Sequence, residues 1–338
     1  MTTATLPPLK TGYTDRPTTL ADLEEVVALM NTCAVATTGA ADETVEQVRT
    51  YWEMPNANLE ANQRVVLNPQ GQIVGWVELE DGDVVVIHMD MFVHPDYENE
   101  GVGEYLYAWS VERSRERVAN APEGTRVVMR AYSRAADVDV WYSGLLREQG
   151  MQLIRHFWHM DMNLDVPPPT PQWSEGITLK EYELGTDKEP IFKVRRETFR
   201  DQFGDVERPY DEHFAEWSHY WESEGVLIPG LWLLAMDGDK IVGINLCKPE
   251  HNGDADRGWV SSLGVMRDYR RRGIGEALLY AAFGKMYEMG KKRVGLGVDA
   301  SSITGAATLY KRVGMRVEKQ FDMHELELRA GVDTTTTG

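Results

Sequence analysis

The chain has little cysteine, a deficit of basic residues and no long apolar run. Its two cysteines, Cys33 and Cys247, have neither a CxxC neighbour nor a nearby histidine, which predicts free thiols in a reducing compartment. No segment approaches the roughly 18 consecutive apolar residues that indicate a membrane span. The first residues, MTTATLPPLK, contain no apolar signal core, so we expect a cytoplasmic protein that is not exported.

Acidic residues outnumber basic ones by 54 to 35, and the formal net charge is −19. A nucleic acid or an anionic membrane would be repelled by such a chain unless a basic face were segregated. The charge therefore predicts neither of these partners and favours a cationic small molecule.

Against this acidic background, residues 270–275 read RRRGIG, and the surrounding segment occurs twice. Residues 93–109 placed over 265–281, with a constant shift of 172, give seven identities in 17 positions. So long a period indicates duplicated domains rather than a solenoid, and 338 residues suit two domains of about 150 residues each.

The proline-rich segment VPPPTPQWSE predicts a stiff linker at the junction of the two copies. We therefore expect an N-terminal domain over 1–165, a linker over 166–175, a C-terminal domain over 176–332 and a disordered tail over 333–338.

Both halves show the same order of elements, which predicts an α/β fold with a mixed, mostly antiparallel sheet flanked by helices in each half. In the second half, strands are expected at 177–183, 231–237, 240–247, 258–265, 293–300 and up to about 328, and helices at 187–201, 210–223, 276–290 and 307–313. In the first half, NQRVVLNP, QIVGWVELE, DVVVIHMDMFV, TRVVMRAY and MQLIRHFWHMDM read as strands, with a helix from Glu104 and a short helix before the last strand.

The order strand, basic turn, Gly-x-Gly, helix brings unpaired backbone N–H groups and the positive end of a helix dipole to one point. Glycine allows a ligand to approach that backbone closely, and a phosphate or diphosphate is the natural ligand. The same sequence pattern would also occur in a tight turn that binds no ligand and whose arginines are only solvated.

Two phosphate-binding motifs can be compared with this segment. No GxxxxGK[ST] occurs, which excludes a P-loop, whereas Gly273-Ile274-Gly275 fits the start of the dinucleotide pattern GxGxx[GA], with Leu278 at its last position and Asp299 ending the next strand. In the dinucleotide fold, however, the strand runs almost directly into the first glycine, and here seven residues separate Val265 from Gly273.

The segment LGVMRDYRRRGIGEALL resembles the acetyl-coenzyme A signature of the GNAT superfamily of N-acetyltransferases, whose core pattern is [RQ]xxGx[GA]. Arg270, Gly273 and Gly275 fill that pattern. The stretch GVDASSITGAATLYKRVGM is similar to the closing motif of the family, and together the resemblance covers essentially 176–328. It implies transfer of an acetyl group from acetyl-CoA, as cosubstrate, to a primary amine of a small molecule.

The resemblance also implies which residues act. Backbone N–H groups of the basic turn would hold the diphosphate, main-chain groups of the preceding strand would serve the pantetheine arm and the oxyanion, and Tyr310 would protonate the leaving thiolate. Ser302 stands where many members have an asparagine, and Met315 replaces an aromatic residue. The implied coenzyme-binding residues are Leu263, Gly264, Val265, Arg270, Arg271, Arg272, Gly273, Ile274, Gly275 and Ser302.

The general base stays open, because the strand 259–263 carries no carboxylate. Water, Glu197, Asp201 and His213 are the candidates. Tyr210, Phe214, Trp217 and Trp221 recur at helical spacing, which predicts packing first and a pocket wall second. No metal site is expected, because the HxxH pair at 156 and 159 points to opposite faces of a strand.

The first half differs at the decisive positions. Glu98-Asn99-Glu100 stands where the second half has three arginines, and Leu146 stands at the place of Tyr310. A carboxylate about 6 Å from a phosphate costs roughly 2 to 3 kcal/mol, so we expect the first domain to be non-catalytic, a layout similar to that of tandem members of the family. A non-enzymatic acyl-CoA-binding or scaffold protein and a nicotinamide dinucleotide enzyme are the alternatives.

Overall fold

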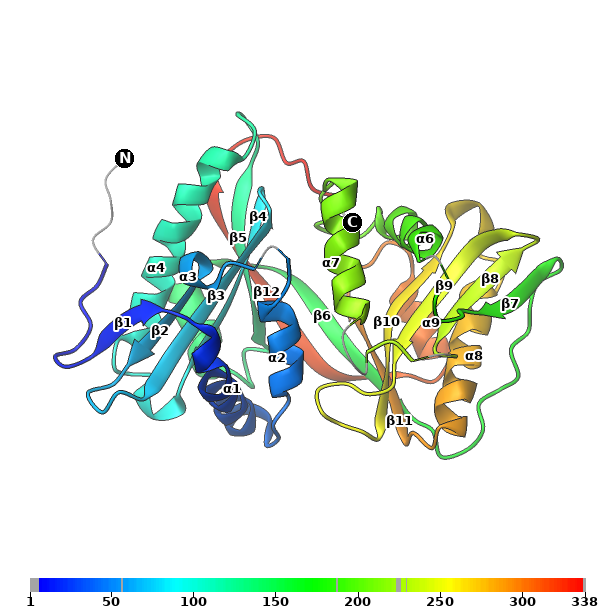
Figure 1. The fold of residues 1–338 in the computed structure, drawn as a ribbon, viewed down its shortest axis with the longest axis horizontal. Coiled ribbons are helices and arrows are strands. Elements are labelled where there is room, and N and C mark those ends of the chain that lie inside the picture. Colours follow the sequence, from blue (N-terminus) through cyan, green and yellow to red (C-terminus); the bar gives the residue numbers. More distant parts are fainter. Residues whose placement is uncertain (1–5, 56, 187, 223–225, 229, 337–338) are drawn as a thin grey trace. The chain divides into compact units, whose positions relative to one another are not determined.

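The computed structural model describes residues 6–336 except 56, 187, 223–225 and 229. The chain divides into two compact units (Figure 1). Unit 1 comprises Met1–His156 and Phe321–Thr334, and unit 2 comprises Phe157–Gln320 and Thr335–Gly338. None of the helices in the described part of the chain has the length and apolarity that a membrane crossing needs.

The helices and strands follow the order expected from the sequence. Those of the first half are β1 (Thr14–Pro17), α1 (Leu23–Thr38), α2 (Val45–Trp52), α3 (Leu59–Asn62), β2 (Gln63–Leu67), β3 (Ile73–Asp83), β4 (Val86–Val93), α4 (Val102–Arg117), β5 (Val127–Arg134), α5 (Val140–Glu148) and β6 (Gln152–Asn163). Those of the second half are β7 (Ile177–Glu181), α6 (Glu189–Phe199), α7 (Tyr210–Glu222), β8 (Trp232–Asp237), β9 (Lys240–Lys248), β10 (Arg257–Val265), α8 (Ile274–Glu288), β11 (Arg293–Asp299), α9 (Ala306–Arg312) and β12 (Arg316–Arg329).

The sheet of each unit is mixed and mostly antiparallel, which confirms the predicted fold class. The strand order is β1-β2-β3-β4-β5-β12 in unit 1 and β6-β11-β10-β9-β8-β7 in unit 2. The parallel pairs are β4 with β5 and β10 with β11, and α4 and α8 are the crossover helices between them. The shift of 172 that relates the two sequences also relates the first residues of these helices, Val102 and Ile274.

Each unit takes one strand from the other half of the sequence. Phe157–Asn163 of β6 pairs with β11, and Phe321–Arg329 of β12 pairs with β5. The sequence pattern did not predict these partners, because periodicity reports which face of a strand is buried and not which strand lies alongside. The division of the sequence at 166–175 remains a prediction about the duplicated copies.

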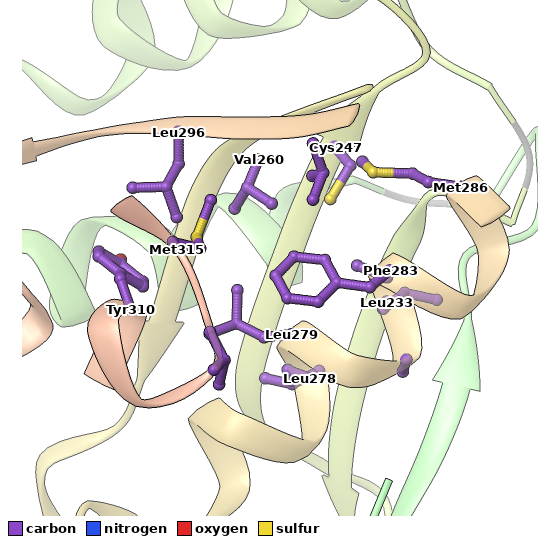
Figure 2. Close-up of a cluster of buried hydrophobic side chains, with 14 of the residues drawn as sticks. Leu233, Cys247, Val260, Leu278, Leu279, Phe283, Met286, Leu296, Tyr310 and Met315 are labelled. Carbon is purple, nitrogen blue, oxygen red and sulfur yellow. The ribbon is translucent and has the colours of Figure 1, made fainter. Parts of the chain in front are cut away.

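In unit 2 helices cover both faces of the sheet. Helices α8 and α9 pack on one face with Phe283, Leu279 and Cys247 (Figure 2). Helices α6 and α7 cover the other, where Trp217 and Trp221 are buried against the strands. The aromatic stripe of α7 is therefore packing, as predicted.

A buried imidazole lies just before β10. His251 stacks on Trp259 with 3.6 Å between ring centroids and 8° between the planes. Burial lowers the pKa of His251 to about 2. Both of its ring nitrogens are buried and find no hydrogen-bond partner among the described residues.

Replacing His251 by phenylalanine is expected to raise the melting temperature and to reduce the acid sensitivity of folding. Between pH 6.5 and pH 2 the unfolded chain protonates this imidazole and the folded chain does not, so His251 lowers stability by up to about 1.4 kcal/mol per pH unit on acidification. Urea unfolding of the wild type and of His251→Phe at pH 7 and pH 5 measures the difference. An equal loss of stability in both proteins between these pH values would contradict the prediction.

Candidate active site

Strands β10 and β11 part halfway along their length. They pair from Arg257–Val260 with Arg293–Leu296, although β10 continues to Val265 and β11 to Asp299. At the same point the pairing of β10 with β9 shifts by one residue at Ser261, which is a β-bulge. A bulge bends its strand, and bulges are common beside active sites. In the pairing that the structure describes, the edge of β10 beyond Val260 therefore offers backbone groups to a ligand.

Two adjoining pockets of unit 2 lie along this gap. We call the first the turn pocket; it encloses about 860 Å³, partly open to solvent, between the end of β10, residues 269–276 and α9. The second, the loop pocket, encloses about 730 Å³ between residues 198–203, β10 and β11. The residues that line both are Thr198, Leu263, Thr304, Ala306 and Tyr310.

The turn after β10 has the backbone of an anion site. Arg271 has φ 61° and Gly273, the N-cap of α8, has φ 79°. Left-handed residues curve a turn so that successive N–H groups converge, an arrangement that binds anions. The first N–H groups of α8 lack acceptors within the helix and add to it.

The three arginines of the turn do different things. The Arg270 guanidinium donates to Val265 O at 3.1 Å, to Thr198 O at 3.3 Å and to Asp201 at 2.8 Å, so each of its three nitrogens already donates to the protein. Arg272 donates to Glu175 O at 3.3 Å. Arg271 is exposed and forms no hydrogen bond or ion pair with another described residue. The cation that is available to a ligand is therefore Arg271.

Asp201 joins the turn to the loop after α6. Its carboxylate accepts from Arg270 and from Arg267. Hydrogen bonds from Arg270 and Arg267 lower the pKa of Asp201 below its ordinary value. A carboxylate held by two guanidinium groups is a weak proton acceptor, which argues against Asp201 as the base.

The other two candidate bases lie elsewhere. Glu197 pairs with Arg200 at 3.1 Å on the exposed side of α6. The His213 ring packs edge-on against Phe192, with 5.0 Å between centroids, and burial lowers its pKa to about 4. Neither side chain lines the described parts of the two pockets.

Tyr310 lies on α9 at the junction of the two pockets. Its side chain packs beside Leu279, Leu296 and Met315 (Figure 2), and 7% of the residue is exposed. Burial raises the pKa of Tyr310 to about 12. The phenol forms no hydrogen bond with another described residue, so its proton is available to a ligand.

Gly264 lets α6 approach β10. A Cβ added to Gly264 would lie 2.2 Å from Thr198 Oγ1 and 2.7 Å from Thr198 Cβ. No side chain fits at 264 without displacing the end of α6, which forms part of both pockets.

The two pockets differ in charge. Arg270, Arg271 and Arg312 line the turn pocket together with one carboxylate, that of Glu276. The loop pocket is lined by the carboxylates of Asp201 and Asp299, and its described lining holds no lysine, arginine or histidine. An anion therefore suits the turn pocket, and the loop pocket is the less basic of the two.

Most of the residues chosen from the sequence lie together. Those that line the turn pocket are Leu263, Gly264, Val265, Arg270, Arg271, Gly273, Ile274, Gly275 and Tyr310. Ser302 lines the loop pocket instead, and Arg272 lines neither described pocket. Thr198, Ser261 and Thr304 were missed, because no motif distinguishes them from other small polar residues. Within the described residues, no group of three histidine, cysteine or acidic side chains could hold a metal ion.

The sequence was compared with protein families. The model of the acetyltransferase (GNAT) family matches residues 25–132 and 189–315, which is more than half of the chain and includes both copies of the repeat. The chain belongs to the GNAT acetyltransferase family. It is therefore an acyltransferase of a family that uses an acyl-CoA donor, and the dinucleotide alternative is set aside.

Individual relatives agree with this assignment. A GCN5-related N-acetyltransferase from Sphaerobacter thermophilus is 32% identical, with a TM-score of 0.78 over 96% of this chain and 99% of that one. A mycothiol acetyltransferase of Actinosynnema mirum is 26% identical over 252 residues, 72% of this chain and 77% of the relative. A tandem GNAT protein from the clavulanic acid biosynthesis pathway, at 15% identity and a TM-score of 0.72 over 94% and 99% of the two chains, shares the fold.

In unit 1, side chains of the protein contact the turn before α4, which corresponds to the turn before α8 in unit 2. Gly101, the N-cap of α4, has φ 81°, so the backbone matches that at Gly273. Glu100, however, pairs with Lys10 at 2.5 Å, and the Trp141 indole donates to Glu98 O at 3.0 Å. A Cβ on Gly103 would lie 2.8 Å from Trp141, which shows how closely this ring covers the first turn of α4.

Substitutions at Arg270 and Arg271 should separate structure from ligand binding. Arg270→Lys removes the fork that joins Val265, Thr198 and Asp201, and we expect a loss of about 1 to 3 kcal/mol of stability. Arg271→Ala removes a charge without a protein partner, so the melting temperature should stay constant while CoA binds about fivefold more weakly. Thermal unfolding and calorimetric titration with CoA measure both. Unchanged CoA affinity in Arg271→Ala would contradict the assignment.

Proposed function

We propose that the protein transfers an acetyl group from acetyl-CoA to a primary amine of a small molecule, with the active site in the C-terminal GNAT copy. The observation that carries this proposal is the position of Tyr310, which lines both the basic turn pocket and the adjoining loop pocket. A donor in one pocket and an acceptor in the other would meet at this side chain.

The turn pocket is the proposed site of acetyl-CoA. The converging N–H groups from Arg271 to Gly275 and the Arg271 guanidinium would bind the diphosphate. The free edge of β10 from Leu263 to Val265 would bind the pantetheine arm as a strand binds its neighbour. Arg270 would orient this edge rather than contact phosphate, and Thr304 is better placed than Ser302 to reach the coenzyme.

The loop pocket is the proposed acceptor site. Its described lining holds no lysine, arginine or histidine, so an amine meets fewer positive charges there than in the turn pocket, although Asp201 is already paired with Arg267 and Arg270. Relatives named mycothiol acetyltransferases support a small molecule as acceptor. The acceptor amine reaches this site mostly protonated and must lose a proton before it reacts.

The proposed reaction is a direct attack. The neutral amine nitrogen bonds to the thioester carbonyl carbon, the carbon–sulfur bond breaks, and the Tyr310 phenol gives its proton to the departing thiolate. The nitrogen then releases its extra proton to solvent, and the Tyr310 phenolate takes a proton back from solvent. A raised pKa keeps this phenol protonated at neutral pH. The ammonium proton is lost to solvent, because Asp201 is held by arginines and Glu197 and His213 lie outside the described pocket linings.

Tyr310→Phe is the decisive variant. It keeps the ring that packs on α8 and removes only the acid, so kcat should fall about 10²- to 10⁴-fold while the Kd of CoA stays constant. Thiol release from acetyl-CoA is measured with a panel of primary amines that includes amino sugars, aminoglycosides, polyamines and peptides. Wild-type kcat in this variant would contradict the role of Tyr310.

A non-enzymatic acyl-CoA-binding protein is the alternative. The panel tests it directly, because CoA binding by the wild type without thiol release with any amine would favour it over acetyl transfer.

We also propose that the N-terminal GNAT copy binds no coenzyme and is non-catalytic. Lys10 and Trp141 occupy its turn, two carboxylates replace arginines there, and Leu146 stands at the place of Tyr310. The N-terminal copy would therefore keep the fold but lack both the arginines that bind the diphosphate and the phenol that protonates the thiolate.

Matched glycine variants test this asymmetry. Gly101 and Gly273 are both left-handed N-caps, and a Cβ added to either meets no atom within 4 Å. Gly101→Ala and Gly273→Ala should each cost about 1 kcal/mol of stability, but only Gly273→Ala should weaken CoA binding, because a ligand would meet the new Cβ. Calorimetry should give one CoA per chain. Two CoA per chain, or weaker binding in Gly101→Ala, would contradict the proposal.

A further inference from the structure

The loop after α6 forms one wall of the loop pocket. Phe199, Asp201, Gln202 and Phe203 line the pocket from this loop, which carries no helix or strand between Phe199 and Tyr210. The shape of the pocket therefore depends on what holds the loop in place.

Within the loop, turns satisfy only part of the backbone. Gln202 N–H donates to Phe199 O at 2.8 Å and Asp205 N–H to Gln202 O at 3.1 Å. Arg200 O, Gly204 N–H and Asp205 O need other partners. Arg200 is also the C-cap of α6, where carbonyl groups lack N–H donors within the helix.

The C-terminal tail supplies these partners. Gly204 N–H donates to Thr336 O at 2.8 Å and Thr336 N–H donates to Asp205 O at 3.0 Å, a reciprocal pair like one rung of a sheet. The Thr336 hydroxyl donates to Arg200 O at 3.1 Å. The sequence predicted a disordered tail over 333–338; in the structure these three hydrogen bonds hold Thr336 against the loop of unit 2, and 337–338 lie outside the described residues.

Arg208 O at the far end of the loop accepts from Arg196 at 3.1 Å, and two further attachments hold the part of the loop that lines the pocket. Asp201 attaches it to Arg267 and Arg270 beside the turn pocket, and Thr336 attaches it three to four residues further along. The attachment through Asp201 joins the loop to the proposed coenzyme site, so it affects both substrates. The attachment through Thr336 touches the loop alone, and the described residues of the tail line neither pocket.

We propose that the C-terminal tail is a functional part of the acceptor site, with Thr336 as a positioning residue for the loop that recognises the amine. This inference rests on the proposed function, because it takes the loop pocket as the acceptor site. Loss of the tail leaves three backbone groups of the loop to water and frees Gln202 and Phe203 to move. The loss should weaken acceptor binding and spare coenzyme binding.

Two variants test the tail. A chain that ends after Asp333 removes all three hydrogen bonds, and Thr336→Pro removes the N–H donor and the hydroxyl. Each should raise KM for the best amine of the panel about tenfold, with the Kd of CoA and the melting temperature unchanged. Thr336→Val keeps both backbone hydrogen bonds and is the matched control, for which we expect less than a threefold rise.

Hydrogen exchange gives a readout that does not need an acceptor. The Gly204 amide should exchange faster in the truncated chain, whereas amides of α8 should keep their protection. Equal KM and equal Gly204 protection in the truncated and full chains would overturn the inference while leaving the proposed function intact. Failure of the wild type to acetylate any amine would contradict the proposed function instead. A fall in kcat with a constant KM would also overturn the inference, since it would place the tail in the chemistry.

Discussion

The separation of two parallel strands after Val260 is the constraint on which the site depends. The backbone of a strand in the middle of a sheet normally forms hydrogen bonds with a neighbouring strand on each side. Over its last residues β10 pairs, among the described strands, with β9 alone. A bulge at Ser261 begins the separation, a glycine at 264 allows a helix to close in, and a left-handed turn follows. The pockets, the free strand edge and the anion-binding turn are all consequences of this gap.

Ionic contacts decide which parts of the site are fixed and which can meet a ligand. The fork of Arg270 binds the end of the strand, the end of α6 and Asp201 at once. Arg271, one residue along, has no partner in the described chain. Adjacent arginines that look alike in sequence therefore differ in their contacts, because Arg270 is bound by the protein and Arg271 is exposed.

The fold and the candidate site could be predicted from the sequence only where they depend on local patterns. Helix and strand positions followed from periodicity, and the Gly-x-Gly turn located the site because only a few backbone conformations suit that spacing. The partners of β6 and β12, the capture of Arg270 by Asp201 and the role of Thr198 depend on contacts between distant segments. Such contacts leave no local pattern, so the structure alone reveals them.

The exchanged strands have a consequence for the history of the molecule. A duplicated protein can ordinarily be separated again into two independent folds, since each copy retains its own complete sheet. Here β6 completes unit 2 and β12 completes unit 1, so a gene cut at the proline-rich junction would yield two incomplete sheets, each with an unsatisfied edge prone to aggregation. The N-terminal copy is thus retained by topology, independently of any part in catalysis.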